Sequence, residues 1–336
     1  MMKNQKIGSP IIPRNKADPT QSGRQVRKMF RDIDNRYYEL KKALKQLFDL
    51  SFTGREKIQS PTQSYILAKN AQDEPDTIFK VNAGVYVYDL AERPAEYARF
   101  LERLQSILDD YLLEGGDERL WAFGYVSDEY ERGTLNAYTN LAVQSEVYAQ
   151  QTTLTYLLSQ PAYQNQVAAA FISTYSDWRG LSDAARTDLA NVIGTSIARG
   201  INPRETARIV SQRLDVSMTR AKAIAQTEQV GALRRANWNE TTWASERLGL
   251  KTGILWISAL KPTTRPSHAA RSGKIFTVEE VEYFYSINGN RYNCYCGNQP
   301  VLLNEDGTLH NPSILDRLIQ SRDEWEEKRQ ESTSNS

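Results

Sequence analysis

The sequence feature that most constrains the fold is a strict seam of apolar residues near the N-terminus. Between about Ser22 and Leu50, apolar positions recur in alternating steps of four and three residues, which places them on one face of an α-helix. The seam consists of Val26, Phe30, Ile33, Tyr37, Leu40, Leu44 and Leu47. It is narrower than the apolar stripe of most globular helices, so two interpretations stand. Either the helix packs on the protein's own helices, or it binds a partner through Phe30, Ile33, Tyr37 and Leu40.

Charge is distributed unevenly along this sequence. Residues 1–50 carry 12 Lys and Arg against 5 Asp and Glu, whereas residues 303–336 carry 4 against 8. The whole chain has a formal net charge of only +1, so bulk charge does not indicate a nucleic-acid binder. The basic positions of the first helix could contact phosphates, or they could simply form a solvated helix face.

Most of the chain before Gly249 has helical periodicity. Residues 1–21 are polar and proline-bearing, which favours a flexible arm, and residues 51–75 are polar and irregular. A short strand is expected around 78–89. Helices are expected at 22–50, 92–113, 117–159, 162–178, 183–199, 203–214 and from Ser217 onward, with a break at Trp178-Arg179-Gly180.

The residue pattern changes after Gly249, where the sequence consists of short segments rich in β-forming residues. Strands are expected at 253–257, 275–276 and 300–303, and Asn288-Gly289 indicates a hairpin between Tyr283–Ile287 and Asn290–Cys296. A charged helix over about 312–330 and a disordered end at 331–336 complete the chain. The prediction is an α+β fold: a predominantly helical body, a small C-terminal β-rich subdomain and a long N-terminal amphipathic helix. The expected domains are 1–50, 51–180, 181–303 and 304–336.

One stretch of the helical region carries an unusual acid. On the helix containing Arg220–Glu228, Glu228 lies in line with the apolar positions Ala221, Ile224 and Ala225. A carboxylate on such a face needs a partner, because an unpaired buried charge is very costly. The two interpretations are a structural ion pair, with Arg265 as the best partner, and a catalytic acid.

Four motifs in a fixed order give this chain a family resemblance. They are R-A-K-A-I-A-Q-T-E from Arg220 to Glu228, then Trp256, then T-x-R-P-S-H with Arg265 and His268, and finally N-C-x-C with Cys294 and Cys296. Together they resemble the Mu F-like phage head morphogenesis family of minor head proteins. The resemblance covers about Leu181 to Leu303.

The resemblance implies a non-enzymatic role in procapsid and head assembly near the portal. The implied partners are the portal protein and the major capsid or scaffold protein, with genomic double-stranded DNA as a further candidate and no membrane. The implied location is the virion, reached from the host cytoplasm during assembly. The alternative is an enzyme or toxin-delivery module of the ADP-ribosyl-transfer or nuclease class, using Glu228, Arg265 and His268.

The two cysteines are the remaining residues with distinctive chemistry. Cys294 and Cys296 are too close in sequence for an unstrained disulfide, which favours a reducing compartment. With His268 they supply three zinc-type ligands, but a structural zinc site uses four, and the family's usual histidine is replaced by Arg291. The sequence therefore predicts no metal and no cofactor, and reads these residues as part of a packed β-hairpin with reduced thiols. Neither a signal peptide nor a long apolar run is visible.

Overall fold

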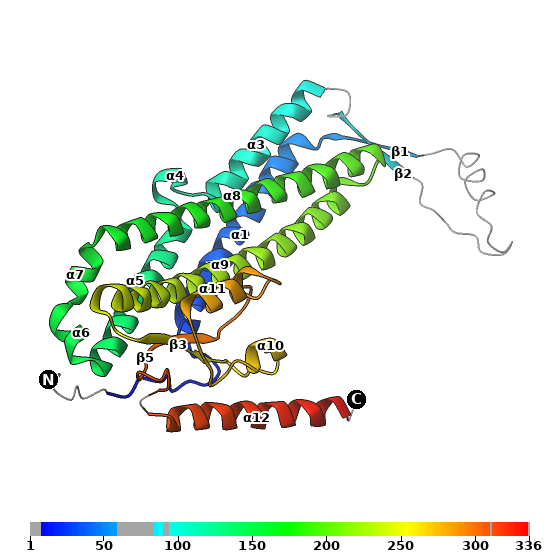
Figure 1. Cartoon of the computed structure of the whole chain (residues 1–336). Coiled ribbons are helices and arrows are strands. Elements are labelled where there is room, and N and C mark those ends of the chain that lie inside the picture. The colour runs from blue at the N-terminus through cyan, green and yellow to red at the C-terminus, as the bar shows by residue number, and fades with distance from the viewer. Residues whose placement is uncertain (1–7, 59–83, 90–93, 310, 335–336) are drawn as a thin grey trace. The chain divides into compact units, whose positions relative to one another are not determined.

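A computed structural model of the chain describes residues 8–58, 84–89, 94–309 and 311–334 (Figure 1). The fold is α+β and predominantly helical, with a small antiparallel sheet near the C-terminus, as the sequence predicts. The helices are α1 Gly23–Ser51, α3 Pro94–Leu112, α4 Gly116–Arg119, α5 Trp121–Gln144, α6 Glu146–Gln151, α7 Leu154–Ser159, α8 Pro161–Ala198, α9 Pro203–Leu248, α10 Pro266–Ala269, α11 Val278–Ser286 and α12 Ser313–Ser334. The strands are β1 Gly54–Ile58, β2 Gly84–Tyr88, β3 Thr252–Ile257, β4 Ile275–Phe276 and β5 Gly297–Leu302.

The chain divides into two compact units, each assembled from separate stretches. Unit 1 comprises residues 1–31, 119–176 and 222–336, and unit 2 comprises residues 32–118 and 177–221. The division falls inside α1, α4, α8 and α9. The four domains expected from the sequence stay predictions.

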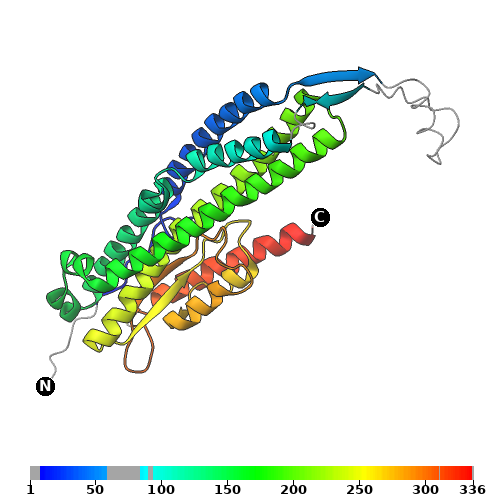
Figure 2. The ribbon, with the colours of Figure 1, turned by 90° about the horizontal axis from the view of Figure 1, so that it is seen from above.

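In unit 2, the seam of α1 lies in the protein's own core. Ile33, Tyr37 and Leu40 are at most 1% exposed, and the Tyr37 hydroxyl is 2.7 Å from Ser217 Oγ on α9. Figure 2 shows α3 beside this part of α1, where Arg36 donates to the Tyr111 carbonyl. Since these apolar side chains are already buried, the expectation that they bind a partner is corrected.

The fourth expected partner residue, Phe30, lies in unit 1 and is half-buried. The Lys222 ammonium lies 5.7 Å from the centre of its ring. The narrow seam thus indicates a helix enclosed by its own fold, which is the first of the two interpretations that the periodicity allowed.

An antiparallel pair of strands, β1 and β2, also belongs to unit 2. The expected strand at 78–89 is observed as Gly84–Tyr88, and its earlier part lies outside the described residues. Strand β1 falls within the stretch expected to be irregular, and the rest of that stretch from residue 59 is likewise outside the described residues. Tyr88 is buried and donates to the Ile201 carbonyl, so this side chain anchors β2 to the rest of the unit.

Two long helices replace the series of short helices that the sequence suggested. The expected break at Trp178-Arg179-Gly180 lies inside α8, and the expected start at Ser217 lies inside α9. A helical glycine costs about 1 kcal/mol, which the burial of Trp178 at 1% exposure outweighs. The predicted start at Asn202 is confirmed, since its Oδ1 accepts from the Arg204 amide at 2.9 Å.

Unit 1 contains a close crossing of α5 and α9. A Cβ atom placed on Gly133 would lie 2.7 Å from both the Ala236 Cβ and the Leu233 carbonyl oxygen. Only glycine fits this contact. On the same helix, Gly124 has open space where its Cβ would be.

The sheet of unit 1 has the order β4-β3-β5, with β3 antiparallel to both neighbours. Alternate residues of β3 face opposite sides. Ile254 and Trp256 belong to a cluster with α9 and α11, whereas Leu255 and Ile257 pack with residues of α12 (Figure 1). Both faces of the sheet are therefore covered by helices.

Helix α5 also covers one edge of this sheet. Asn140 and Gln144 donate from their side-chain amides to the Pro300 carbonyl of β5, and Gln144 Oε1 accepts from the Leu302 amide at 3.0 Å. The otherwise open backbone groups of an edge strand are thus satisfied by side chains.

The expected hairpin around Asn288-Gly289 is wrong. Residues before this dipeptide form α11, which begins with a capping box in which Thr277 and Glu280 satisfy each other's backbone amides. Asn288 and Gly289 do have positive φ, at 52° and 64°, but they end a helix instead of joining two strands. The cap and the burial of Val281, Phe284 and Tyr285 outweigh local β propensity.

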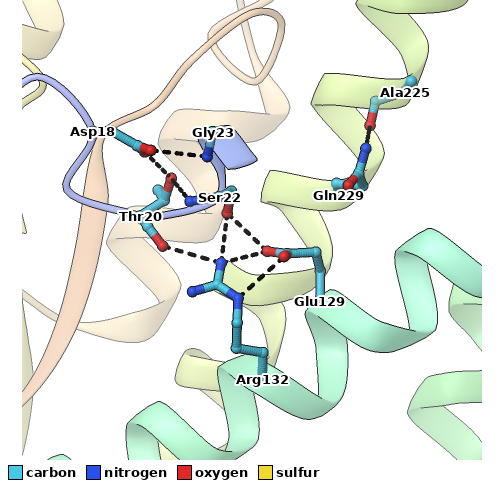
Figure 3. Close-up of polar contacts among 8 residues, drawn as sticks. All are labelled: Asp18, Thr20, Ser22, Gly23, Glu129, Arg132, Ala225 and Gln229. Carbon is cyan, nitrogen blue, oxygen red and sulfur yellow. Dashed lines mark hydrogen bonds and ion pairs between the residues drawn. The ribbon is translucent and has the colours of Figure 1, made fainter. Parts of the chain in front are cut away.

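The N-terminal segment differs from the expected flexible arm, because residues 8–22 contact unit 1. The Ile11 amide donates to Asn140 Oδ1 at 2.7 Å, and Asp18 accepts from the Gly23 amide at the start of α1. Figure 3 shows the polar group at this point: buried Glu129 accepts from Ser22 Oγ and pairs with Arg132. The segment is tied down by these hydrogen bonds.

The C-terminal helix α12 also packs on unit 1, and it extends to Ser334, beyond the point where disorder was expected. Ile314 joins the sheet cluster, and Trp325 Nε1 donates to the Lys261 carbonyl at 2.9 Å. In the part of the chain that the structure describes, no helix combines the length and apolar character needed to cross a membrane.

Candidate metal centre

The structure brings together five of the seven motif residues in unit 1. Trp256 lies on β3, Arg265 precedes α10, His268 lies on α10, and Cys294 and Cys296 lie in the loop before β5. These positions come from separate elements, so only the tertiary fold makes them neighbours.

The other two motif residues, Arg220 and Glu228, lie on α9. Arg220 is exposed and belongs to unit 2. Glu228 is buried at 2% exposure, with Ser173 Oγ at 3.4 Å and Arg235 Nη2 at 3.7 Å. The expected burial of Glu228 is confirmed, and an ion pair joins it to Arg235. The expected pairing of Glu228 with Arg265 stays a prediction.

The two cysteines and the histidine form a compact group. The Nδ1 atom of His268 is 3.3 Å from Cys294 Sγ and 3.8 Å from Cys296 Sγ. All three side chains are buried, and their ligand atoms lie within 4.8 Å of one another. Both cysteines are free thiols. We refer to His268, Cys294 and Cys296 as the Cys–His centre.

A buried arginine shapes the loop that carries the cysteines. Arg234 of α9 donates through Nε to the Cys296 carbonyl at 3.1 Å and through Nη2 to the Cys294 carbonyl at 2.7 Å. Its guanidinium also lies over the Tyr285 ring, 4.4 Å from the ring centre. The planar fork of arginine suits this double contact, so Arg234 fixes the spacing of the two cysteines.

Aromatic rings enclose the histidine. The His268 ring lies 5.0 Å from the Phe284 ring and 5.9 Å from the Trp256 ring, measured between centres. Trp256 in turn stacks on Tyr285 at 5.2 Å. This packing restricts the orientation of the imidazole.

The Nε2 side of His268 has polar neighbours. Asn290 Oδ1 is 3.4 Å away and Arg265 Nη1 is 3.1 Å away. Arg265 also donates to the carbonyls of Asn290 and Tyr292, at 3.0 and 2.7 Å. Arg265 therefore holds the loop after α11 against α10.

The two thiols have opposite pKa shifts. Burial alone would raise the pKa of Cys294, but hydrogen bonding from Cys296 and the positive charge of Arg234, with His268, hold it well below the usual value. The hydrogen bond to Cys294, together with burial, raises the pKa of Cys296 well above the usual value.

The Cys–His centre is reached through a cavity of about 170 Å³. Its wall includes Lys261, Thr264, Arg265 and Tyr295, and the Lys261 ammonium lies 3.8 Å from the centre of the Tyr295 ring. The chemistry of this arrangement is that of a thiolate and imidazole donor set with access from one side.

The sequence identified the three donor residues, but not Arg234, Asn290 and Tyr285, which pack around them. Arg234 lies beside a second arginine, a pattern that usually indicates a solvated helix face. Asn290 and Tyr285 were assigned to a hairpin. The expectation that no metal binds remains untested, although the expected packed hairpin around the thiols is absent from this part of the described chain.

Fold and site together define an α+β protein with a buried Cys–His centre at the edge of a three-stranded sheet. Residues 187–298 match the family described as Phage Mu protein F like protein. The match confirms the Mu F-like resemblance, and residues 187–298 form a Mu F-like segment that extends over parts of both units.

A curated relative also matches. An uncharacterized protein of Haemophilus influenzae is 24% identical over 206 residues, which is 61% of this chain and 44% of the relative. The chain thus spans less than half the length of that relative. No solved structure matches.

Proposed function

We propose that this chain acts in phage head morphogenesis as a non-enzymatic minor head protein near the portal vertex. The observation that carries the proposal is the Mu F-like segment at residues 187–298. The proposed partners are the portal protein and the major capsid or scaffold protein, and the proposed location is the virion.

The arrangement of the motif residues supports a structural role for them. Arg265 and His268 are adjacent, and Glu228 contacts Ser173 and Arg235. These contacts hold elements of the fold together, as a structural role for the motif residues requires.

The experiment is quantitative mass spectrometry of purified procapsids and mature particles. The expected result is that the chain is present in both, in a fixed ratio to the portal protein and in far fewer copies than the major capsid protein. Its absence from both preparations, while heads assemble normally without its gene, would refute the proposal.

A contact with packaged DNA is a second part of the proposal. Arg24, Arg27, Lys28 and Arg31 are exposed on α1. Each phosphate contact releases counterions, so such binding would be independent of base sequence and would weaken steeply with salt.

A pair of matched variants tests this contact. Arg24→Glu with Arg27→Glu should weaken binding to double-stranded DNA and flatten its salt dependence. Arg317→Glu with Lys328→Glu makes the same change of charge at exposed positions of α12 and should have little effect. Equal losses in both double variants would indicate a bulk charge effect and would contradict a contact through α1.

A further inference from the structure

We infer that the Cys–His centre is a zinc site with three protein ligands and one exchangeable position. The ligands are His268 Nδ1, Cys294 Sγ and Cys296 Sγ, and the exchangeable position faces the cavity beside them. This inference is independent of the proposed role in head assembly.

The distances within the centre fit tetrahedral coordination. With Zn–S near 2.3 Å and Zn–N near 2.0–2.1 Å, tetrahedral angles place a ligand nitrogen about 3.6 Å from a ligand sulfur. The two observed distances from His268 Nδ1, 3.3 Å to Cys294 and 3.8 Å to Cys296, lie on either side of that value. Small shifts of the side chains are enough to admit the ion.

Asn290 is oriented so that it can stabilise the histidine tautomer that a metal needs. The Asn290 Nδ2 donates to the Phe284 carbonyl at 2.9 Å, so its Oδ1 faces His268 Nε2. When zinc binds Nδ1, the imidazole proton lies on Nε2, and Asn290 Oδ1 is placed to accept it. Arg265 Nη1, 3.1 Å from Nε2, can only donate, so this contact has to lengthen when the ion binds.

The ligands are held in place before any ion binds. Arg234 fixes the carbonyls of both cysteines, and Trp256 and Phe284 enclose the imidazole. Binding therefore orders few additional side chains, which favours affinity. Two thiolates also neutralise the charge of a divalent ion, and thiolate with imidazole selects zinc over magnesium or calcium.

The fourth position is open toward solvent. Over residues 8–58, 84–89, 94–309 and 311–334, no further Cys, His, Asp or Glu joins the three ligands. The cavity of about 170 Å³ has room for a water molecule or a small anion, and Lys261 and Arg265 line it. An anion would therefore be a favourable exchangeable ligand.

The test uses the full chain, purified under reducing conditions without chelator. Elemental analysis should find one zinc per chain, and replacement by Co²⁺ should give the intense visible bands and sulfur charge-transfer absorption of a tetrahedral thiolate site. Cys294→Ser, Cys296→Ser and His268→Gln should each weaken zinc binding at least about 100-fold in a chelator competition. His310→Gln changes the second histidine of the chain and should leave the stoichiometry at one.

A second variant keeps the test decisive if removal of a ligand unfolds the chain. Asn290→Ala leaves all three ligands in place and should weaken zinc binding by about 10- to 100-fold, because it removes the partner of the ligand histidine. Adding azide to the Co²⁺ form should shift the visible bands, as expected for an exchangeable fourth ligand.

Three results would overturn the inference. The first is wild-type protein with two reduced thiols that takes up no zinc or Co²⁺ on titration. The second is a disulfide between Cys294 and Cys296 that persists in the chain purified under reducing conditions. The third is a Co²⁺ spectrum that azide leaves unchanged, which would show a closed coordination sphere in place of an open position.

Discussion

Glu240 is a buried carboxyl on α9 that should make the free energy of unfolding depend on pH. Its side chain is 6% exposed and accepts a hydrogen bond from the Tyr148 hydroxyl. Burial raises the pKa of Glu240 from 4.5 to about 7, and the hydrogen bond from Tyr148 offsets only part of that effect. Glu240 is therefore neutral in the folded state under mildly acidic conditions.

The direction of the pH dependence follows from which state binds the proton. Between pH 4.5 and about 7, folded Glu240 keeps a proton that the unfolded chain has lost. The free energy of unfolding therefore falls as pH rises through this window, and the contribution is constant below and above it. A shift of about 2.5 units corresponds to about 3 kcal/mol at most.

Glu240→Gln removes the ionisation while keeping an oxygen that can accept from Tyr148. The variant should match the parent near pH 5 and be more stable by about 1–3 kcal/mol near pH 8. Urea denaturation at both pH values measures this difference. Glu246→Gln, on the exposed side of the same helix, is the matched control and should leave the pH dependence unchanged.

A parallel loss of stability in parent and Glu240→Gln protein between pH 5 and 8 would refute this reasoning. Burial also raises the pKa of Glu282, which lines the same cavity as Glu240. Glu282→Gln identifies whether that carboxyl contributes to the same window. The cavity wall also carries Glu279 and Arg247, whose charges stay in place in every variant.

Three further predictions test the packing and capping of unit 1. Gly133→Ala should lower the free energy of unfolding by about 1–3 kcal/mol, because the added methyl group overpacks against α9. Gly124→Ala on the same helix should raise it by up to about 1 kcal/mol. Thermal melts that rank the two variants the other way would contradict the close crossing. Glu129→Gln should lower the free energy of unfolding, measured by denaturation, by about 2–4 kcal/mol. This is less than for a fully buried pair, because Arg132 is partly exposed. An unchanged denaturation midpoint would show that the N-terminal contacts are dispensable. Thr277→Ala should lower stability by about 1 kcal/mol through loss of the capping box, measured as a melting temperature lowered by a few degrees. An unchanged melting temperature would mean that packing alone holds α11.

The candidate centre was partly visible in the sequence. The motif order singled out His268, Cys294 and Cys296 because their donor atoms are rare and close to one another in the family pattern. What the sequence could not show is that the three donors converge, since α10 and the loop before β5 meet only through the fold. Arg234 is 60 residues from Cys294 and gives no local signal of that contact.

Periodicity determined much of the fold by itself. The apolar seam of α1 and the short apolar run of β3 are local properties of the sequence, so these two elements appear where the residues predict them. The positions at which helices end were less predictable. Gly180 and Ser217 resemble helix ends, but burial of neighbouring side chains carries α8 and α9 through them.

Only the tertiary structure decided where each predicted face is buried. A seam of apolar residues requires a partner surface, and the pattern does not say whether that surface belongs to the same chain. In unit 2 the protein supplies it, so Ile33, Tyr37 and Leu40 are core residues. Likewise, β propensity at Tyr283–Tyr285 is a weak local preference, and the capping box with burial against β3 turns that stretch into α11. Local sequence determines which conformations are low in free energy, and long-range burial selects among them.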